Sequence, residues 1–114
     1  MANSLQEIAF TDFMKVEMRI GQVLAVEVPE WSEKLLQLTV DFGEEVGQRT
    51  IFSGIKAYYQ VEDLLNRKFP FVVNLAPRKM GPSVSQGMML MIDAADKPLL
   101  IPIADEVVVG TLLA

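Results

Sequence analysis

The chain has 114 residues, of which 51% are apolar, and this composition suits one domain with a substantial core. The sequence contains neither cysteine nor histidine, which excludes disulfides, thiolate nucleophiles and cysteine-type zinc sites and removes the most common general base. The formal net charge of −5 is ordinary for a protein that stays in solution.

The N-terminal segment lacks the features of a targeting signal. Glu7 and Asp12 interrupt it early, and it has neither the basic start nor the long apolar run of a signal peptide. No stretch approaches the roughly 18 apolar residues that a membrane-spanning helix needs. We therefore expect a soluble, cytoplasmic protein that has no membrane partner.

Apolar and polar residues alternate in the first half of the chain, as in strands. A first strand is predicted over residues 19–28, with one face formed by Ile20, Leu24, Val26 and Val28. A second is predicted over residues 35–42, with one wet face and an inner face formed by Leu36, Leu38, Val40 and Phe42. Residues 43–48 have turn composition and residues 49–55 alternate again, which predicts a hairpin.

The second half begins with a segment that does not alternate. Residues 58–65 predict a short helix that ends near Asn66. Residues 69–77 predict a fourth strand, and its Pro70 favours an edge or a bulge because proline cannot donate to the ladder. Its predicted inner face is Phe69, Phe71, Val73 and Leu75.

A fifth strand is predicted over residues 87–92, followed by a turn at 93–98 and an apolar segment at 99–103. Three strands, a short helix and two strands, in that order, are typical of the oligonucleotide-binding (OB) barrel. We therefore predict an all-β fold, namely a five-stranded OB-fold barrel with a short helix between strands 3 and 4 and small N- and C-terminal extensions. One domain would occupy residues 1–114, with its core at about 15–93.

Positive charge is concentrated in one part of the chain. Residues 49–79 hold six of the ten Lys and Arg residues and only two of the fifteen acidic residues, and residues 69–92 contain no acid. Such a patch suits contacts with phosphate, although a short stretch can also lack acids by chance. Because the Debye length is about 8 Å at physiological salt, distant acids cancel a local patch only in part.

Five motifs occur along the chain in a recognisable order: FMKVEMRIGQVLAVE, SEKLLQLTVDFG, RTIFSGI, VVNLAPRKMG and SQGMML. Together they resemble the tRNA-binding domain that forms a small stand-alone homodimer and that is also appended to methionyl-tRNA synthetases and mammalian synthetase-associated factors. The resemblance covers Phe10 to the C-terminus, and its most specific parts are Ser53-Gly54-Ile55 and Ser85-Gln86-Gly87-Met88.

The resemblance implies a non-catalytic OB-fold protein that binds tRNA by its shape, uses no cofactor or metal and is not expected to bind DNA. It also implies a homodimer, with a methionyl-type aminoacyl-tRNA synthetase as a further partner. The RNA-binding positions that it implies are Lys34, Ser53, Asn74, Arg78, Lys79, Ser85, Gly87 and Met88, to which Lys56 of the cationic segment is added.

The chemistry of these residue types agrees with RNA binding. Arg78 and Lys79 can pair with phosphates, and serine and asparagine suit 2′-hydroxyls or base edges. Each smaller residue also has a structural interpretation, namely a hydrogen bond within the fold for the serines and Asn74 or a turn for Gly87. For Met88 we favour core filling, because it shares its parity with apolar residues.

Two loops depart from the family pattern. Pro82, preceded by Gly81, replaces a glycine that often follows a basic residue, so we expect a different loop shape with one donor and one cation fewer. The loop PEWSEK replaces one that usually carries histidine. Its Trp31 suits base stacking, a cover over the barrel mouth or a dimer contact, and we favour the last two over stacking.

Two other functional classes compete with tRNA binding. A CsaA-like secretion chaperone, which shares the barrel and binds unfolded polypeptide, is the alternative we retain. An enzyme is disfavoured because GPSVS lacks the final glycine of a nucleophile elbow and no histidine exists to activate a serine. The apolar C-terminal VVVGTLLA predicts burial as an extra strand or across a two-fold interface, which agrees with a homodimer.

Overall fold

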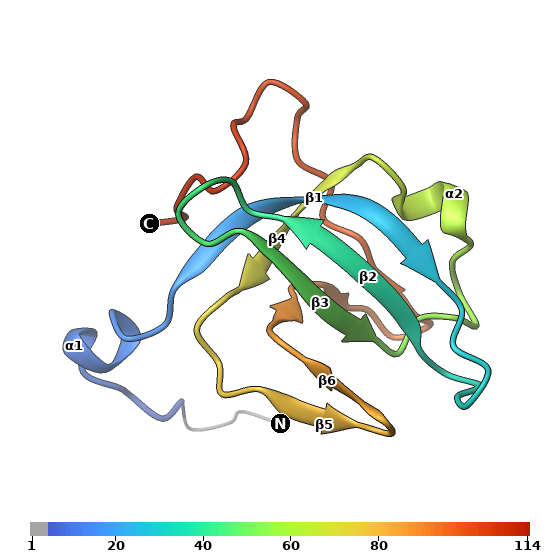
Figure 1. Cartoon of the computed structure of the whole chain (residues 1–114). Coiled ribbons are helices and arrows are strands. Elements are labelled where there is room, and N and C mark those ends of the chain that lie inside the picture. Colours follow the sequence, from blue (N-terminus) through green and yellow to red (C-terminus); the bar gives the residue numbers. More distant parts are fainter. Residues whose placement is uncertain (1–4) are drawn as a thin grey trace.

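The computed structural model describes residues 5–114, and its centre is a curved antiparallel sheet (Figure 1). Five strands form this sheet in the order β3-β2-β1-β4-β7. Their bounds are Met18–Glu27 (β1), Leu36–Asp41 (β2), Gln48–Ser53 (β3), Lys68–Val72 (β4) and Met88–Met89 (β7). The predicted OB-like barrel, with a short helix between β3 and β4, is confirmed.

Smaller elements surround the barrel. Strand β5 (Arg78–Met80) pairs with β6 (Ser83–Ser85), and β8 (Ile92–Asp93) pairs with β9 (Pro98–Leu99) across the predicted turn. The β5–β6 pair forms a ribbon beside the sheet, at the bottom of Figure 1. A short helix, α1 (Phe10–Phe13), precedes β1. In the described part of the chain, no helix has the length and apolar character needed to cross a membrane.

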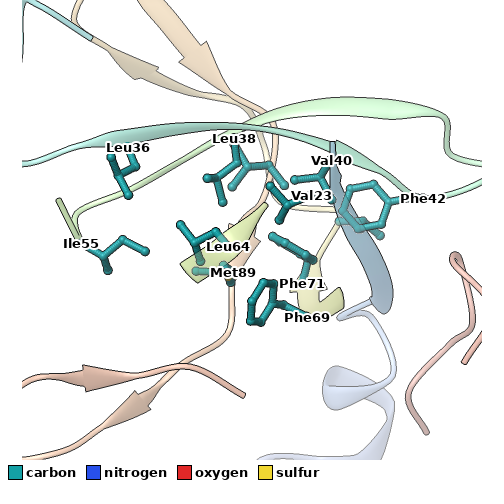
Figure 2. Packing of buried hydrophobic residues seen from close by; sticks show 12 residues of the cluster. Val23, Leu36, Leu38, Val40, Phe42, Ile55, Leu64, Phe69, Phe71 and Met89 are labelled. Atoms are coloured by element: carbon teal, nitrogen blue, oxygen red, sulfur yellow. The ribbon is translucent and has the colours of Figure 1, made fainter. Parts of the chain in front are cut away.

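The core confirms the predicted inner face of the second strand. Each of its four residues is at most 1% exposed, and they pack against aromatic residues of β4 (Figure 2). The rings of Phe42 and Phe71 meet edge to face with their centroids 5.3 Å apart, which is a favoured aromatic geometry. Gly21 of β1 has no room for a side chain, because a Cβ there would lie 2.5 Å from Val40 Cγ1.

A β-bulge in β1 overturns part of the predicted parity. The register against β2 shifts between Val23 and Ala25, and Leu24 is exposed. The prediction that Leu24 shares one face with Val26 is therefore wrong. Val23 faces the core before the bulge and Val26 packs against the core after it, because one extra residue reverses the alternation.

The fourth strand is shorter than predicted and is not at an edge. Strand β4 ends at Val72, between β1 and β7, and Leu75 is 44% exposed. Pro70 nevertheless fits inside the sheet. Its carbonyl accepts a hydrogen bond from Leu90 N (3.0 Å), but the pairing of β4 with β7 includes only Phe71 and Val72. The missing proline N–H thus falls where the ladder to β7 ends.

The fifth strand presents the opposite parity from the predicted one. Met89 is buried, whereas Met88 and Ile92 are exposed, so the prediction that Met88 fills the core is wrong. The inward row here contains Ser85 and Gly87, which are both buried. Because these two residues are not apolar, the hydrophobic pattern pointed to the wrong row.

The predicted helix is also shorter than expected. Helix α2 spans Val61–Leu64, and a capping box fixes its start, with Gln60 N donating to Asp63 Oδ2 (2.8 Å). It ends near Asn66 as predicted, where a φ of +66° turns the chain back toward the sheet.

The C-terminal segment lies along the first half of β1. Gly110 N donates to Ile20 O (2.7 Å), and Leu113 N donates to Met18 O (3.0 Å). The guanidinium of Arg19 fastens this segment by donating to Gly110 O (2.9 Å) and to the carboxylates of Glu17 (2.7 Å) and Glu45 (3.0 Å). The hydrogen bond to Glu17 raises the pKa of Arg19.

Candidate functional site

The residues of the SQGM motif close the barrel. Ser85 Oγ, in a residue only 1% exposed, accepts a hydrogen bond from Phe52 N (3.0 Å) and donates one to Gly87 O (3.1 Å). Gln86 exchanges two hydrogen bonds with Thr50, one through its backbone N (2.8 Å) and one through its side-chain Oε1 (2.9 Å). We call Ser85, Gln86 and Gly87 the seam, because they connect β3, at one edge of the sheet, to the segment that enters β7, at the other edge.

Gly87 has two structural reasons to be glycine. Its φ is +151°, which residues with a side chain rarely adopt, and a Cβ there would lie 2.8 Å from Val72 O. The close backbone approach that glycine permits is therefore used within the fold. Gln86 was absent from the predicted site residues, although the motif that contains it was singled out.

Replacing Ser85 with alanine is expected to lower the free energy of unfolding by about 1–3 kcal/mol, because Phe52 N–H would be left buried without an acceptor. Urea denaturation measures this change. Ser83→Ala in the same ribbon is the matched control, since Ser83 is only half-buried. Equal losses in the two variants would contradict the structural role assigned to Ser85.

The other small predicted residues have different positions. Asn74 Oδ1 accepts a hydrogen bond from Glu17 N (2.8 Å) and its Nδ2 donates to Lys15 O (2.5 Å), so this side chain holds the segment before β1. Ser53 is half-buried at the end of β3, opposite Leu36. Met88 lies at the surface of β7 and is 42% exposed.

Three of the six cations between residues 49 and 79 bind main-chain carbonyls. Arg49 donates to Val73 O (2.9 Å) and Gln86 O (3.1 Å), and Lys68 donates to Asp105 O (2.5 Å) and Val107 O (2.6 Å). Arg67 donates to Asp63 O (2.8 Å) and lies over the Phe69 ring. These three side chains help to hold the fold.

The other three, Lys56, Arg78 and Lys79, are candidates for ligand contacts. Within residues 5–114, none of the six cations lies within 4.0 Å of a carboxylate, since the ion pairs there involve only Lys15 and Arg19. Arg78 and Lys79 are exposed on β5. Their charges are therefore available to an anion.

The loop between β1 and β2, which carries Lys34, contacts both segments that hold these charges. Lys56 N donates to Lys34 O (3.2 Å), so the two lysines lie on adjacent backbone segments. Three residues earlier in the same loop, Trp31 packs on the turn of the β5–β6 ribbon, where a Cβ on Gly81 would lie 2.6 Å from its Cε3. Figure 1 shows this loop and the tip of the ribbon on the same side of the barrel.

We call Lys34, Lys56, Arg78, Lys79 and Trp31 the cationic strip. The Trp31 ring centroid is 5.6 Å from that of Phe52, whose residue is only 4% exposed, so the indole covers part of the barrel. This agrees with the favoured covering interpretation of Trp31. Sequence reasoning did not predict that the two departing loops contact each other.

The ribbon turn explains the sequence Gly81-Pro82. Met80 pairs with Ser83, which leaves a two-residue loop, and Gly81 has a φ of +57°. Glycine with positive φ followed by proline near −65° is typical of a type II′ hairpin turn. The N–H that proline lacks is in the turn, so no ladder bond is lost. The altered loop is therefore a tight ribbon.

Two observations bear on what this surface can bind. In the described residues, no group of three or more acidic side chains gathers as metal ligands would. The cationic strip instead suits an extended anion, because its four cations lie on backbone segments that contact one another.

Residues 18–112 match the family model described as "Putative tRNA binding domain". The chain belongs to this tRNA-binding domain family. The resemblance found in the sequence is therefore confirmed over most of the chain.

Curated relatives of this tRNA-binding domain include methionine–tRNA ligases. That of Burkholderia ambifaria (strain MC40-6) is 50% identical over 90 residues, which cover 79% of this chain and 12% of the ligase. That of Psychrobacter arcticus is 44% identical over 108 residues, which cover 94% of this chain and 15% of the ligase. The tRNA-binding domain thus spans less than a sixth of these relatives.

Solved structures similar to this tRNA-binding domain carry two kinds of description. The MetRS related protein from Pyrococcus horikoshii has a TM-score of 0.90 and 39% identity, covering 96% of this chain and 100% of that one. The CsaA chaperone protein from Picrophilus torridus has a TM-score of 0.86 and 26% identity, covering 95% and 100%. The barrel is therefore common to both candidate functions.

Proposed function

We propose that this chain is a non-catalytic tRNA-binding protein and that the cationic strip is its RNA-binding surface. The observation that carries the proposal is that four cations, two on β5 and two on loops, lie on backbone segments that contact one another in a protein with a net charge of −5. None of them has a carboxylate partner within the described residues. Ser53 and Met88, which are partly exposed, are proposed to add contacts beside it.

A role beside an aminoacyl-tRNA synthetase is also proposed. The relatives are methionine–tRNA ligases, in which the matching domain is a small part of a larger enzyme. A domain that binds tRNA raises the effective concentration of tRNA at a synthetase to which it is joined or bound. We propose that this occurs in the cytoplasm, where tRNA is charged.

Assembly into a homodimer is proposed from the two ends of the chain. Apolar residues of α1 and of the C-terminal segment line one cleft of about 490 Å³, among them Phe10, Phe13, Met14, Leu112 and Leu113. An exposed apolar surface of this kind marks an interface, and a two-fold axis would place the same patch of two copies together.

Wild-type protein is expected to bind tRNA more tightly than duplex DNA or unstructured RNA of equal length, with log affinity falling linearly as log salt rises. Gel-shift titrations at several salt concentrations measure this. Labelled tRNA should also resist competition by an unfolded polypeptide.

The chaperone function is the second candidate, and the similarity to the CsaA structure favours it. If no complex formed with tRNA in dilute buffer while unfolded polypeptide bound, tRNA binding would be rejected in favour of that role.

A further inference from the structure

The β5–β6 ribbon is attached to the barrel unevenly. Within residues 5–114, its hydrogen bonds to the barrel arise only at the base, where Ser85 meets Phe52 and Gln86 follows with Thr50. The tip of the ribbon instead rests on a packing contact with Trp31, from a loop about fifty residues earlier in the sequence. Arg78 and Lys79 lie between the base and the tip.

The contact at the tip depends on glycine. A Cβ at Gly81 would lie 2.6 Å from both Cε3 and Cζ3 of Trp31, and the φ of +57° also disfavours a side chain. Trp31 is the single tryptophan of the chain and is 41% exposed. One part of its ring is thus covered by the ribbon and by Phe52 while the remainder faces solvent.

We propose that Trp31 is a positioning residue that holds the β5–β6 ribbon against the β1–β2 loop, so that Arg78 and Lys79 form one phosphate-binding surface with Lys34 and Lys56. The inference rests on the proposed tRNA binding. A ribbon without support at its tip must be ordered when RNA binds, and that ordering lowers affinity. Support from the indole arranges the four charges before the RNA arrives.

A double-mutant cycle tests this role through the salt dependence of tRNA binding. In the wild type, Arg78→Ala with Lys79→Ala should reduce the slope of log affinity against log salt by about 1.5, for two phosphate contacts. In a Trp31→Ala background the same pair should reduce it by less than about half of that, because the ribbon charges are already displaced.

Two variants control for loss of the ring itself. Trp31→Phe keeps an aromatic ring on the ribbon and should keep the wild-type slope within about 0.5. Gly81→Ala keeps the indole but displaces it, so it should reproduce the slope of Trp31→Ala. In RNA-free protein, the amides of the β5–β6 ribbon should exchange with solvent faster in Trp31→Ala than in the wild type.

The outcomes separate this role from the proposed function. The wild type could bind tRNA and the reductions in slope caused by Trp31→Ala and by the Arg78 and Lys79 substitutions could be fully additive. In that case Trp31 contacts RNA independently, for example by stacking on a base, and the positioning role is overturned. Unchanged amide exchange in Trp31→Ala also overturns it. If the wild type binds no tRNA, the proposed function falls and this role falls with it.

Discussion

Replacing Arg78 and Lys79 together with alanine is expected to weaken the proposed tRNA binding by about tenfold or more and to flatten the salt slope by about 1.5 units. Each contact with a phosphate releases condensed counterions, so its loss reduces the dependence of affinity on salt. The two side chains are exposed on β5 and make no ion pair within the described residues. Their removal therefore leaves the fold intact.

Lys15→Ala with Lys97→Ala is the matched control for this double substitution. It removes the same charge from exposed positions outside the cationic strip. Lys15 pairs with Asp12, and Lys97 lies over the Tyr59 ring. The control pair should change the slope by less than about 0.5. If both pairs flattened the slope equally, net charge alone would explain binding and the β5 cations would have no special part.

Light scattering at micromolar concentration should give the wild type twice the 12.7 kDa mass of one chain. Phe10→Asp or Leu112→Asp should give single chains, because a carboxylate at the cleft would lose its hydration on association. These two residues are 73% and 56% exposed, so neither substitution should unfold the chain.

The control for the dimer is Leu65→Asp, which places the same charge at another exposed apolar residue, after α2. That variant should retain the wild-type mass. A wild-type mass near 12.7 kDa would refute the dimer, and dissociation by Leu65→Asp would show that the effect is not specific to the cleft.

The regular strands were predictable from sequence where one face is apolar throughout. The second strand is the clear case, since Leu36, Leu38, Val40 and Phe42 are all buried as predicted. The pattern failed where the backbone departs from regular pairing, at the bulge near Leu24. It also failed where Ser85 and Gly87 take inward positions that apolar residues normally fill. The bulge leaves the alternation of the sequence unchanged, and the two small inward residues make the exposed row look like the apolar one.

The candidate site was only partly predictable, for a different reason. The charge count identified the segment that holds Arg78 and Lys79, but in the same segment Arg49 and Lys68 turn inward to main-chain carbonyls contributed by distant residues. Which cation remains free depends on those tertiary neighbours. In the same way, the contact between Trp31 and Gly81 joins two loops whose separate sequences give no sign of each other.

The seam has a consequence for how such chains are assigned a role. Its residues are used in joining one edge of the sheet to the other. The stability of the barrel is therefore a sufficient reason for these residues, whichever ligand the barrel binds. A chain with this barrel that binds protein instead of nucleic acid would keep the same three residues for the same structural reason. A match to this motif therefore indicates the fold. The ligand has to be inferred from the loops around the barrel.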